Sequence, residues 1–211
     1  METHPLRRAR ENAIGARAKR QTANAERRTP MKLVLAGTGA SGAIYLQRLL
    51  QQIDCQRHEM HLVLSSYAKQ VISDELDRLE LPKTVREHND RSMNAPFASG
   101  STIFDAMVIV PCSMGTIGRI AAGTSESLII RAADVFLKER RKLILVPRET
   151  PWSLIHLRNC ATLAQAGATI LPAIPSFYSS PKSIDELADT VVHRILDQLG
   201  QLVSGAFRWA E

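Results

Sequence analysis

Short apolar runs alternate with amphipathic stretches along most of this chain. The runs lie at residues 32–36, 61–64, 107–110, 143–146 and 168–171. Each has the length of one buried strand, and the spacing of apolar residues between them is typical of helices. Buried strands joined by helices form parallel crossover units. The pattern therefore predicts a single α/β domain with a mostly parallel sheet.

Residues 107–150 contain two of these strands and the polar turns that follow them. The run at 107–110 breaks at Pro111 and leads into the hydroxyl-rich turn 112–116. A long helical segment comes next, and the run at 143–146 then breaks at Pro147 before the turn 148–150. In open parallel sheets the ligand crevice lies outside the carboxyl ends of the strands. Both turns are therefore expected to line one site.

The helical segment between these strands has a charged face. Arg131, Asp134 and Lys138 are spaced i, i+3 and i+7, which places them on one side of a helix. Apolar residues of the same segment fall on the opposite side and suit packing on a sheet. Two cations on this face, with Arg148 after the next strand, would suit a phosphate group. The alternative interpretation is an ordinary solvated helix face.

A glycine-rich turn, residues 37–42, follows the first strand and precedes a helix. It has the G-x-G-x-x-G spacing of a dinucleotide site, where glycines let backbone amides approach a phosphate. Such a site also needs an acidic residue at the end of the second strand. Here that strand ends in Ser65 and Ser66, with no carboxylate. The hydroxyls of Ser41, Ser65 and Ser66 instead suit the single phosphate of a mononucleotide.

Composition narrows the functional class. The chain has 211 residues and 45% hydrophobic residues, enough for one domain with a substantial core. No apolar run approaches the roughly 18 residues of a membrane span. Three cysteines without paired spacing indicate neither a disulfide framework nor a zinc site, and a reducing cytoplasm is the simplest location.

The net charge of +6 is concentrated at the start of the chain. Residues 1–30 contain eight cations and three acids, so they account for +5 of the total. The nearly neutral remainder argues against a nucleic-acid-binding surface. We expect residues 1–30 to be a disordered basic extension, and residues 31–211 to form the domain. We further expect this extension to be either a dispensable tail or an upstream extension of a protein that starts at Met31.

Two segments carry aromatic residues outside the predicted elements. Residues 81–104 have the composition of a loop, and Phe97 lies within it. Phe207 and Trp209 lie near the end of the chain. A monomer would gain little by exposing these rings, so the sequence predicts that residues 92–101 and 206–209 contribute to subunit contacts or to a shared site.

Several blocks of this sequence together resemble the UbiX-type flavin prenyltransferases. The resemblance extends from about Met31 to Trp209, and the many blocks in one order make it specific. The blocks are Thr38-Gly-Ala-Ser-Gly-Ala43, Ala98-Ser-Gly-Ser101, Val110-Pro-Cys-Ser-Met-Gly-Thr116, Arg131-Ala-Ala-Asp134, Leu137-Lys-Glu-Arg-Arg141, Val146-Pro-Arg-Glu-Thr150, Ile155-His-Leu-Arg-Asn159, Phe177-Tyr178 and Arg208-Trp209.

The resemblance implies a three-layer flavodoxin-like or Rossmann-like fold, assembled into a homododecamer with FMN between subunits. It implies transfer of a dimethylallyl group from dimethylallyl monophosphate to reduced FMN, without a metal. The prenylated FMN would serve a UbiD-type decarboxylase, of ubiquinone biosynthesis or of aromatic-acid catabolism. Neither nucleic acid nor a membrane is implied as a partner.

The resemblance also assigns roles to individual residues. The catalytic set would be Ser41, Glu75, Lys138, Glu149 and Trp209, with the two glutamates handling protons and Trp209 closing the site. The cofactor-binding set would be Gly39, Ala40, Ser41, Ser65, Ser113, Met114, Thr116 and Arg148. The phosphate-binding set would be Arg131, Lys138, Arg148, Tyr178 and Arg194.

The sequence departs from this family in two places: the segment 91–94, which looks longer than usual, and the basic extension at the start.

Two other functions share the predicted fold. A flavin-dependent cysteine decarboxylase would have P-A-S-A-N-T where this chain has Phe97-Ala-Ser-Gly-Ser-Thr102. A non-catalytic FMN-binding subunit or carrier would share the flavin residues but would not need the cluster of phosphate-binding cations.

Overall fold

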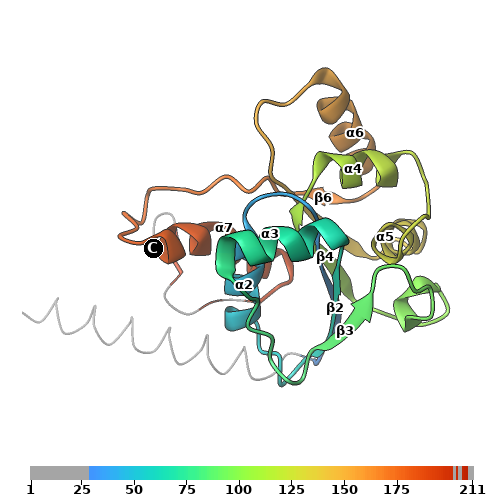
Figure 1. The fold of residues 1–211 in the computed structure, drawn as a ribbon, viewed down its shortest axis with the longest axis horizontal. Helices are drawn as coiled ribbons and strands as arrows, with labels where there is room; N and C mark the ends of the chain where they lie inside the picture. Colours follow the sequence, from blue (N-terminus) through green and yellow to red (C-terminus); the bar gives the residue numbers. More distant parts are fainter. Residues whose placement is uncertain (1–28, 202, 204–205, 209–211) are drawn as a thin grey trace, which may run out of the picture.

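The computed structural model describes residues 29–201, 203 and 206–208. Within them, six parallel strands form one sheet in the order β3-β2-β1-β4-β5-β6 (Figure 1). The strands are β1 (Lys32–Gly37), β2 (Glu59–Leu64), β3 (Arg86–Asn89), β4 (Ala106–Cys112), β5 (Lys142–Pro147) and β6 (Thr169–Ile170). This is the Rossmann strand order, in which the chain reverses direction across the sheet between β1 and β4.

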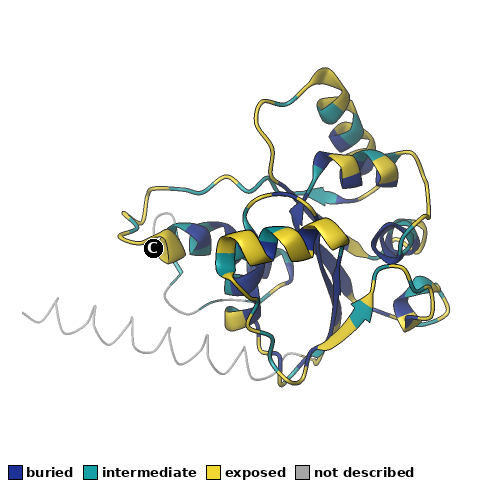
Figure 2. Cartoon of the chain, viewed as in Figure 1, coloured by how far each residue is buried: buried dark blue, intermediate teal, exposed yellow. Residues whose placement is uncertain are grey.

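Helices cover both faces of the sheet, as Figures 1 and 2 show. They are α2 (Ala43–Gln52), α3 (Ser66–Leu76), α4 (Met114–Ala121), α5 (Leu128–Lys138), α6 (Leu154–Gln165) and α7 (Ile184–Gln198). Because side chains alternate along a strand, Leu33 and Leu35 pack in a core with α2, α3 and α7. Val34 and Ala36 pack in a second core with α4, α5 and α6. The predicted three-layer α/β fold with a parallel sheet is confirmed.

The prediction that the third apolar run breaks at Pro111 is wrong. Strand β4 continues through Pro111 to Cys112, and its pairing with β5 shifts register between Ile109 and Cys112. An irregularity of this kind is where an inner strand tolerates proline, because the missing N–H falls outside the regular ladder.

The long helical segment expected between β4 and β5 is two helices. Helix α4 ends before Gly123, which has a φ of +70°, and α5 begins after Ser127. The Ser127 hydroxyl accepts a hydrogen bond from the Ile130 N–H, as helix-capping residues do. The break separates the turn after β4 from the charged face of α5.

The segment expected to be a loop contains the edge strand β3 and a short 3₁₀ helix, Pro96–Ala98. The sequence of β3, Arg-Glu-His-Asn, is polar, so only its backbone pairing with β2 marks it as a strand. We expected residues 92–101 to contribute to subunit contacts or to a shared site partly because a monomer would leave the Phe97 ring exposed. The ring is not exposed, so Phe97 no longer supports that prediction. Phe97 is completely buried and packs edge-on against His61, His88 and Phe104.

A buried threonine joins the turn after β1 to the end of β4. The Thr38 N–H and hydroxyl both donate to the Pro111 carbonyl, each at 3.1 Å. The same hydroxyl accepts from the Ser113 N–H at 2.8 Å. Thr38 is only 3% exposed, so these polar groups have little access to water as an alternative partner.

We expect Thr38→Val to lower the free energy of unfolding by about 1–3 kcal/mol, because it leaves the partly buried Ser113 N–H without its acceptor. Chemical denaturation monitored by circular dichroism measures the change. The matched control is Thr162→Val, which removes an exposed hydroxyl that donates to the Arg158 carbonyl; its effect should stay within about 0.5 kcal/mol. Equal effects of the two substitutions would contradict this role for Thr38.

Candidate active site

The turns after β1, β4 and β5 meet at the carboxyl edge of the sheet. Thr38 connects the first two turns, and the Arg148 N–H donates to the Cys112 carbonyl at 3.2 Å, which connects the second and third. Most of the predicted cofactor-binding residues lie in these turns. The structure therefore brings them to the topological switch point, where parallel sheets bind their ligands.

The glycines of the first turn are required by packing and by backbone conformation. A Cβ on Gly39 would lie 2.5 Å from the Cβ of Tyr67, too close for any other residue. Gly42 caps α2 with a φ of +109°, a conformation that side chains disfavour. Between them Ala40 is buried and Ser41 is exposed. Ser41 is therefore the side chain that this turn presents to the crevice.

The carboxylate of Glu75 occupies the amino end of α2. It accepts hydrogen bonds from the Gly42 N–H at 2.9 Å and the Ala43 N–H at 2.8 Å, and from the Ser41 hydroxyl. The sequence had suggested a ligand phosphate for these amides, but the chain supplies its own anion. Desolvation acts to raise the pKa of Glu75, yet these hydrogen bonds and the nearby charge of Arg148 outweigh it, so the pKa lies below its ordinary value.

Two further hydroxyls cap the helices that start at this edge. Ser65 accepts from the Ala68 N–H at the start of α3, and Ser113 accepts from the Thr116 N–H at the start of α4. The Ser113 and Thr116 hydroxyls lie 3.0 Å apart. Met114 and Thr116 are buried. In a single chain, Ser65 and Ser113 are thus the partly exposed side chains of these two turns.

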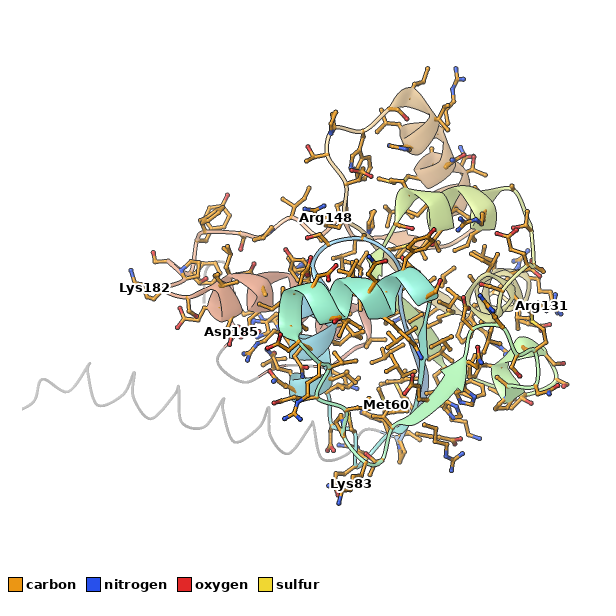
Figure 3. The ribbon with its side chains drawn as sticks, viewed as in Figure 1. Met60, Lys83, Arg131, Arg148, Lys182 and Asp185 are labelled. Atoms are coloured by element: carbon orange, nitrogen blue, oxygen red, sulfur yellow. The ribbon has the colours of Figure 1, made fainter. Side chains whose placement is uncertain are left out.

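The cations of α5 lie beside the loop after the 3₁₀ helix, away from the switch point. The Arg131 Nε donates to the Ala98 carbonyl at 3.0 Å, and its Nη1 pairs with Asp134 at 3.0 Å. Lys138 pairs with Glu139 at 2.5 Å. Figure 3 shows Arg131 and Arg148 on different sides of the molecule.

Tyr178 and Arg194 line a separate cavity of about 850 Å³, beside α7 and the end of the chain. The Tyr178 ring stacks on Phe207, with the ring centroids 6.4 Å apart. Asp197 accepts from Arg194 at 3.3 Å and from both terminal nitrogens of Arg208 at 2.6 Å. Trp209, predicted to close the site, lies outside the described residues.

The five predicted phosphate-binding residues therefore do not converge within one chain. Arg148 lies at the switch point near Glu75, Arg131 and Lys138 lie beside the loop at 98–102, and Tyr178 and Arg194 line the cavity at α7. Among the described residues, the side chain of Glu149 accepts a hydrogen bond from the neighbouring Thr150 N–H alone, at 3.0 Å.

Sequence reasoning missed the roles of Thr38 and Asp197. Thr38 is the first residue of the block Thr38-Gly-Ala-Ser-Gly-Ala43. Its position directly after a strand indicates that its hydroxyl can reach the end of the neighbouring strand. Asp197 lies three residues after Arg194, a spacing that predicts an ion pair on one helix face.

No three or more His, Cys, Asp or Glu side chains among the described residues gather where they could hold a metal ion. None of the described helices is long and apolar enough to cross a membrane. The three cysteines are free and buried, and burial raises the pKa of the Cys112 thiol.

Comparison with known proteins identifies the family. A profile described as Flavoprotein matches residues 21–196. Flavin prenyltransferase UbiX of Methanocaldococcus jannaschii is 46% identical over 182 residues, which cover 85% of this chain and 98% of the relative. The chain belongs to the UbiX family of flavin prenyltransferases.

Solved structures of the family have the same fold. The structure of AnUbiX in complex with FMN and dimethylallyl pyrophosphate matches with a TM-score of 0.81 and 42% identity, covering 86% of this chain and 98% of that chain. A dodecameric FMN-dependent UbiX-like decarboxylase from Escherichia coli O157:H7 matches with a TM-score of 0.78 and 40% identity, covering 86% and 100%. The predicted family membership is confirmed.

The lowered pKa of Glu75 predicts how its contribution to stability depends on pH. A carboxylate whose folded pKa is depressed stabilises the fold above its unfolded pKa of about 4.3, and this stabilisation is lost as pH falls toward the folded value. We expect Glu75→Gln to be less stable than the wild type at pH 7, by less than about 1 kcal/mol because the group is exposed.

Denaturation curves recorded from pH 7 to below pH 4 test this expectation, because the difference between wild type and variant should shrink below about pH 4.3. The control is Asp74→Asn, which removes a neighbouring carboxylate without a hydrogen bond to the described residues. A Glu75→Gln difference that stays constant over the whole range would contradict the assignment.

Proposed function

We propose that this chain transfers a dimethylallyl group from dimethylallyl monophosphate to reduced FMN. The observation that carries the proposal is the similarity, over 86% of this chain, to a relative whose structure holds both FMN and dimethylallyl pyrophosphate. The product would be consumed by a UbiD-type decarboxylase, and the reaction would take place in the cytoplasm.

The switch point fits a flavin mononucleotide. Ser41, Ser65 and Ser113 present hydroxyls at three neighbouring strand ends, and Gly39 lets the Tyr67 side chain pack closely on the first turn. No carboxylate follows β2, so the ribose of a dinucleotide would lack its usual partner. Because Glu75 already neutralises the amino end of α2, the FMN phosphate would need the amides and hydroxyls of α3 and α4, where Ser65 and Ser113 lie.

The phosphate of the allylic substrate needs positive charge as its C–O bond breaks. Lys138, Arg148 and Arg194 would supply it, with a hydrogen bond from Tyr178, because charge-assisted donors stabilise a departing phosphate. Reduced FMN, the second substrate, supplies the electron-rich ring that accepts the allyl group.

Two carboxylates would handle protons. The lowered pKa keeps Glu75 ionised at neutral pH, so it would accept a proton through its hydrogen bond with Ser41 rather than donate one. Glu149 lies next to Arg148 in the chain and is exposed at the edge of the site. As the second carboxylate that the resemblance assigns to proton handling, it would take part in proton transfer at this edge.

A complete site would need more than one copy of the chain, because the phosphate donors of a single chain lie apart. Exposed apolar side chains are available for such contacts: Leu154, Ile155 and Leu157 on α6 are 60%, 68% and 51% exposed. Phe207 is 50% exposed beside the cavity. We therefore expect a homo-oligomer, a dodecamer as in the Escherichia coli relative, with Trp209 closing the shared site.

Substitution of the phosphate donors tests the enzymatic function. A charge-assisted hydrogen bond to phosphate contributes about 1.5–3 kcal/mol, so Lys138→Ala and Arg148→Ala should each slow prenyl transfer by about 10- to 150-fold. Both variants should keep the fold and bind FMN. The assay supplies reduced FMN and dimethylallyl monophosphate and follows the prenyl mass on the flavin.

Lys83→Ala is the matched control, because Lys83 is exposed at the far end of the molecule from Arg148 (Figure 3). It should transfer prenyl groups at the wild-type rate. A wild type that binds FMN but never prenylates it would favour a carrier, and unchanged rates in the two variants would remove Lys138 and Arg148 from the site.

Co-expression of two inactive variants tests whether subunits share the site. If one copy supplies Lys138 and another Arg194, random mixing of Lys138→Ala and Arg194→Ala chains restores about a quarter of the sites. Neither variant alone should show this activity. No recovery in a verified mixed oligomer, or a monomeric mass in light scattering, would contradict the shared site.

A further inference from the structure

Arg141 has no part in the proposed phosphate cluster, yet it makes two well-placed hydrogen bonds. It lies in the turn that joins α5 to β5, and its side chain is partly buried. Its Nη2 donates to the Gly100 carbonyl at 2.7 Å and its Nη1 to the Thr102 carbonyl at 2.8 Å. The planar guanidinium suits two acceptors at once, which a lysine ammonium does not.

The segment 98–102, which we call the clamped loop, is held by arginines at every second carbonyl. Arg131 binds the Ala98 carbonyl, and Arg141 binds those of Gly100 and Thr102. The 3₁₀ helix that leads into the loop also packs against α5 (Figure 1). Arg131 lies in α5 and Arg141 lies in the turn directly after it. The loop is therefore attached to the helix that carries Lys138 and to the turn that follows it.

Gly100 brings the backbone of the clamped loop directly onto Lys138. A Cβ at this position would lie 2.2 Å from the Glu139 Oε1 and 2.9 Å from the Lys138 Nζ. A methyl group at this position would therefore force the ends of the Glu139 and Lys138 side chains to move. The same carboxylate oxygen accepts from the Lys138 ammonium at 2.5 Å, so loop, carboxylate and ammonium are in mutual contact.

We propose that Arg141 is a positioning residue for substrate binding. By holding the Gly100 and Thr102 carbonyls, it keeps the clamped loop against Glu139 and so restricts where the Lys138 ammonium can lie. A lysine side chain has many rotamers, and ordering it before the phosphate arrives removes part of the entropic cost of binding. This inference rests on the proposed function, because it assumes that Lys138 binds the substrate phosphate.

The test compares Arg141→Gln with Arg140→Gln, which removes the adjacent exposed cation. The probe is dimethylallyl monophosphate, titrated calorimetrically into FMN-loaded protein, with FMN affinity, oligomer mass and melting temperature measured in parallel. We expect Arg141→Gln to raise the Kd and KM for this probe by on the order of tenfold, with kcat and FMN affinity nearly unchanged. Arg140→Gln should resemble the wild type.

Gly100→Ala provides a second route to the same result, because its methyl group would displace Glu139 and Lys138. The effect of Gly100→Ala on the Kd should be smaller when Glu139→Ala is already present, since the closest clash is then removed. This coupling is not expected if Gly100 matters only for folding. It also tests the loop contact should Arg141→Gln fail to fold.

Three results would overturn the inference. The first is that Arg141→Gln and Arg140→Gln bind the probe with the same affinity. If the wild type still prenylates FMN, this result refutes the role of Arg141 and leaves the proposed function intact. The second is an equal loss of FMN affinity and probe affinity, which would assign Arg141 a general structural role. The third is an absence of coupling between Gly100→Ala and Glu139→Ala. A wild type that neither binds nor uses the probe would instead refute the proposed function itself.

Discussion

The hydrogen bonds of Thr38 determine the geometry of the whole functional edge. Strands β1 and β4 lead their helices to opposite faces of the sheet, and this divergence creates the crevice between their carboxyl ends. Thr38 bridges that point by donating to Pro111 and accepting from Ser113. Because these polar groups have little access to water, a different spacing between the turn after β1 and the end of β4 would leave them without hydrogen-bond partners. This connection holds Ser113, which caps α4, against the turn after β1.

At the carboxyl edge of the sheet, a carboxylate of the chain itself takes the position expected for a ligand phosphate. The amino end of α2, which the glycine-rich turn exposes, is satisfied by the chain's own Glu75. Positive charge for a ligand must therefore come from other helix ends or from side chains, and the predicted cationic side chains lie on elements that are far apart in one chain. The clamped loop adds a second layer, in which Arg141 holds the backbone that contacts Lys138. Substrate binding would then depend on residues that never touch the substrate.

Local patterns in the sequence predicted the repeating elements well and the irregular ones poorly. Apolar runs located five of the six described strands, because burial on both faces gives an uninterrupted hydrophobic signal. Edge strand β3 was not predicted, because its pairing depends on backbone groups and its side chains are polar. Pro111 was taken as a strand end, although a register shift lets β4 continue. Phe97 was expected to be poorly buried within one chain, although His61 and His88 pack against its ring.

The sequence by itself determined the α/β class, the parallel crossovers, the glycine-rich turn and, through its motifs, the family. Each of these depends on residue type and spacing within a short stretch, which is information that the chain carries locally. Only the tertiary structure decided that Glu75 occupies the α2 amides, that Arg141 holds the clamped loop, and that the phosphate donors of one chain stay apart. Those facts depend on distances between residues remote in sequence, which packing sets and no local pattern encodes.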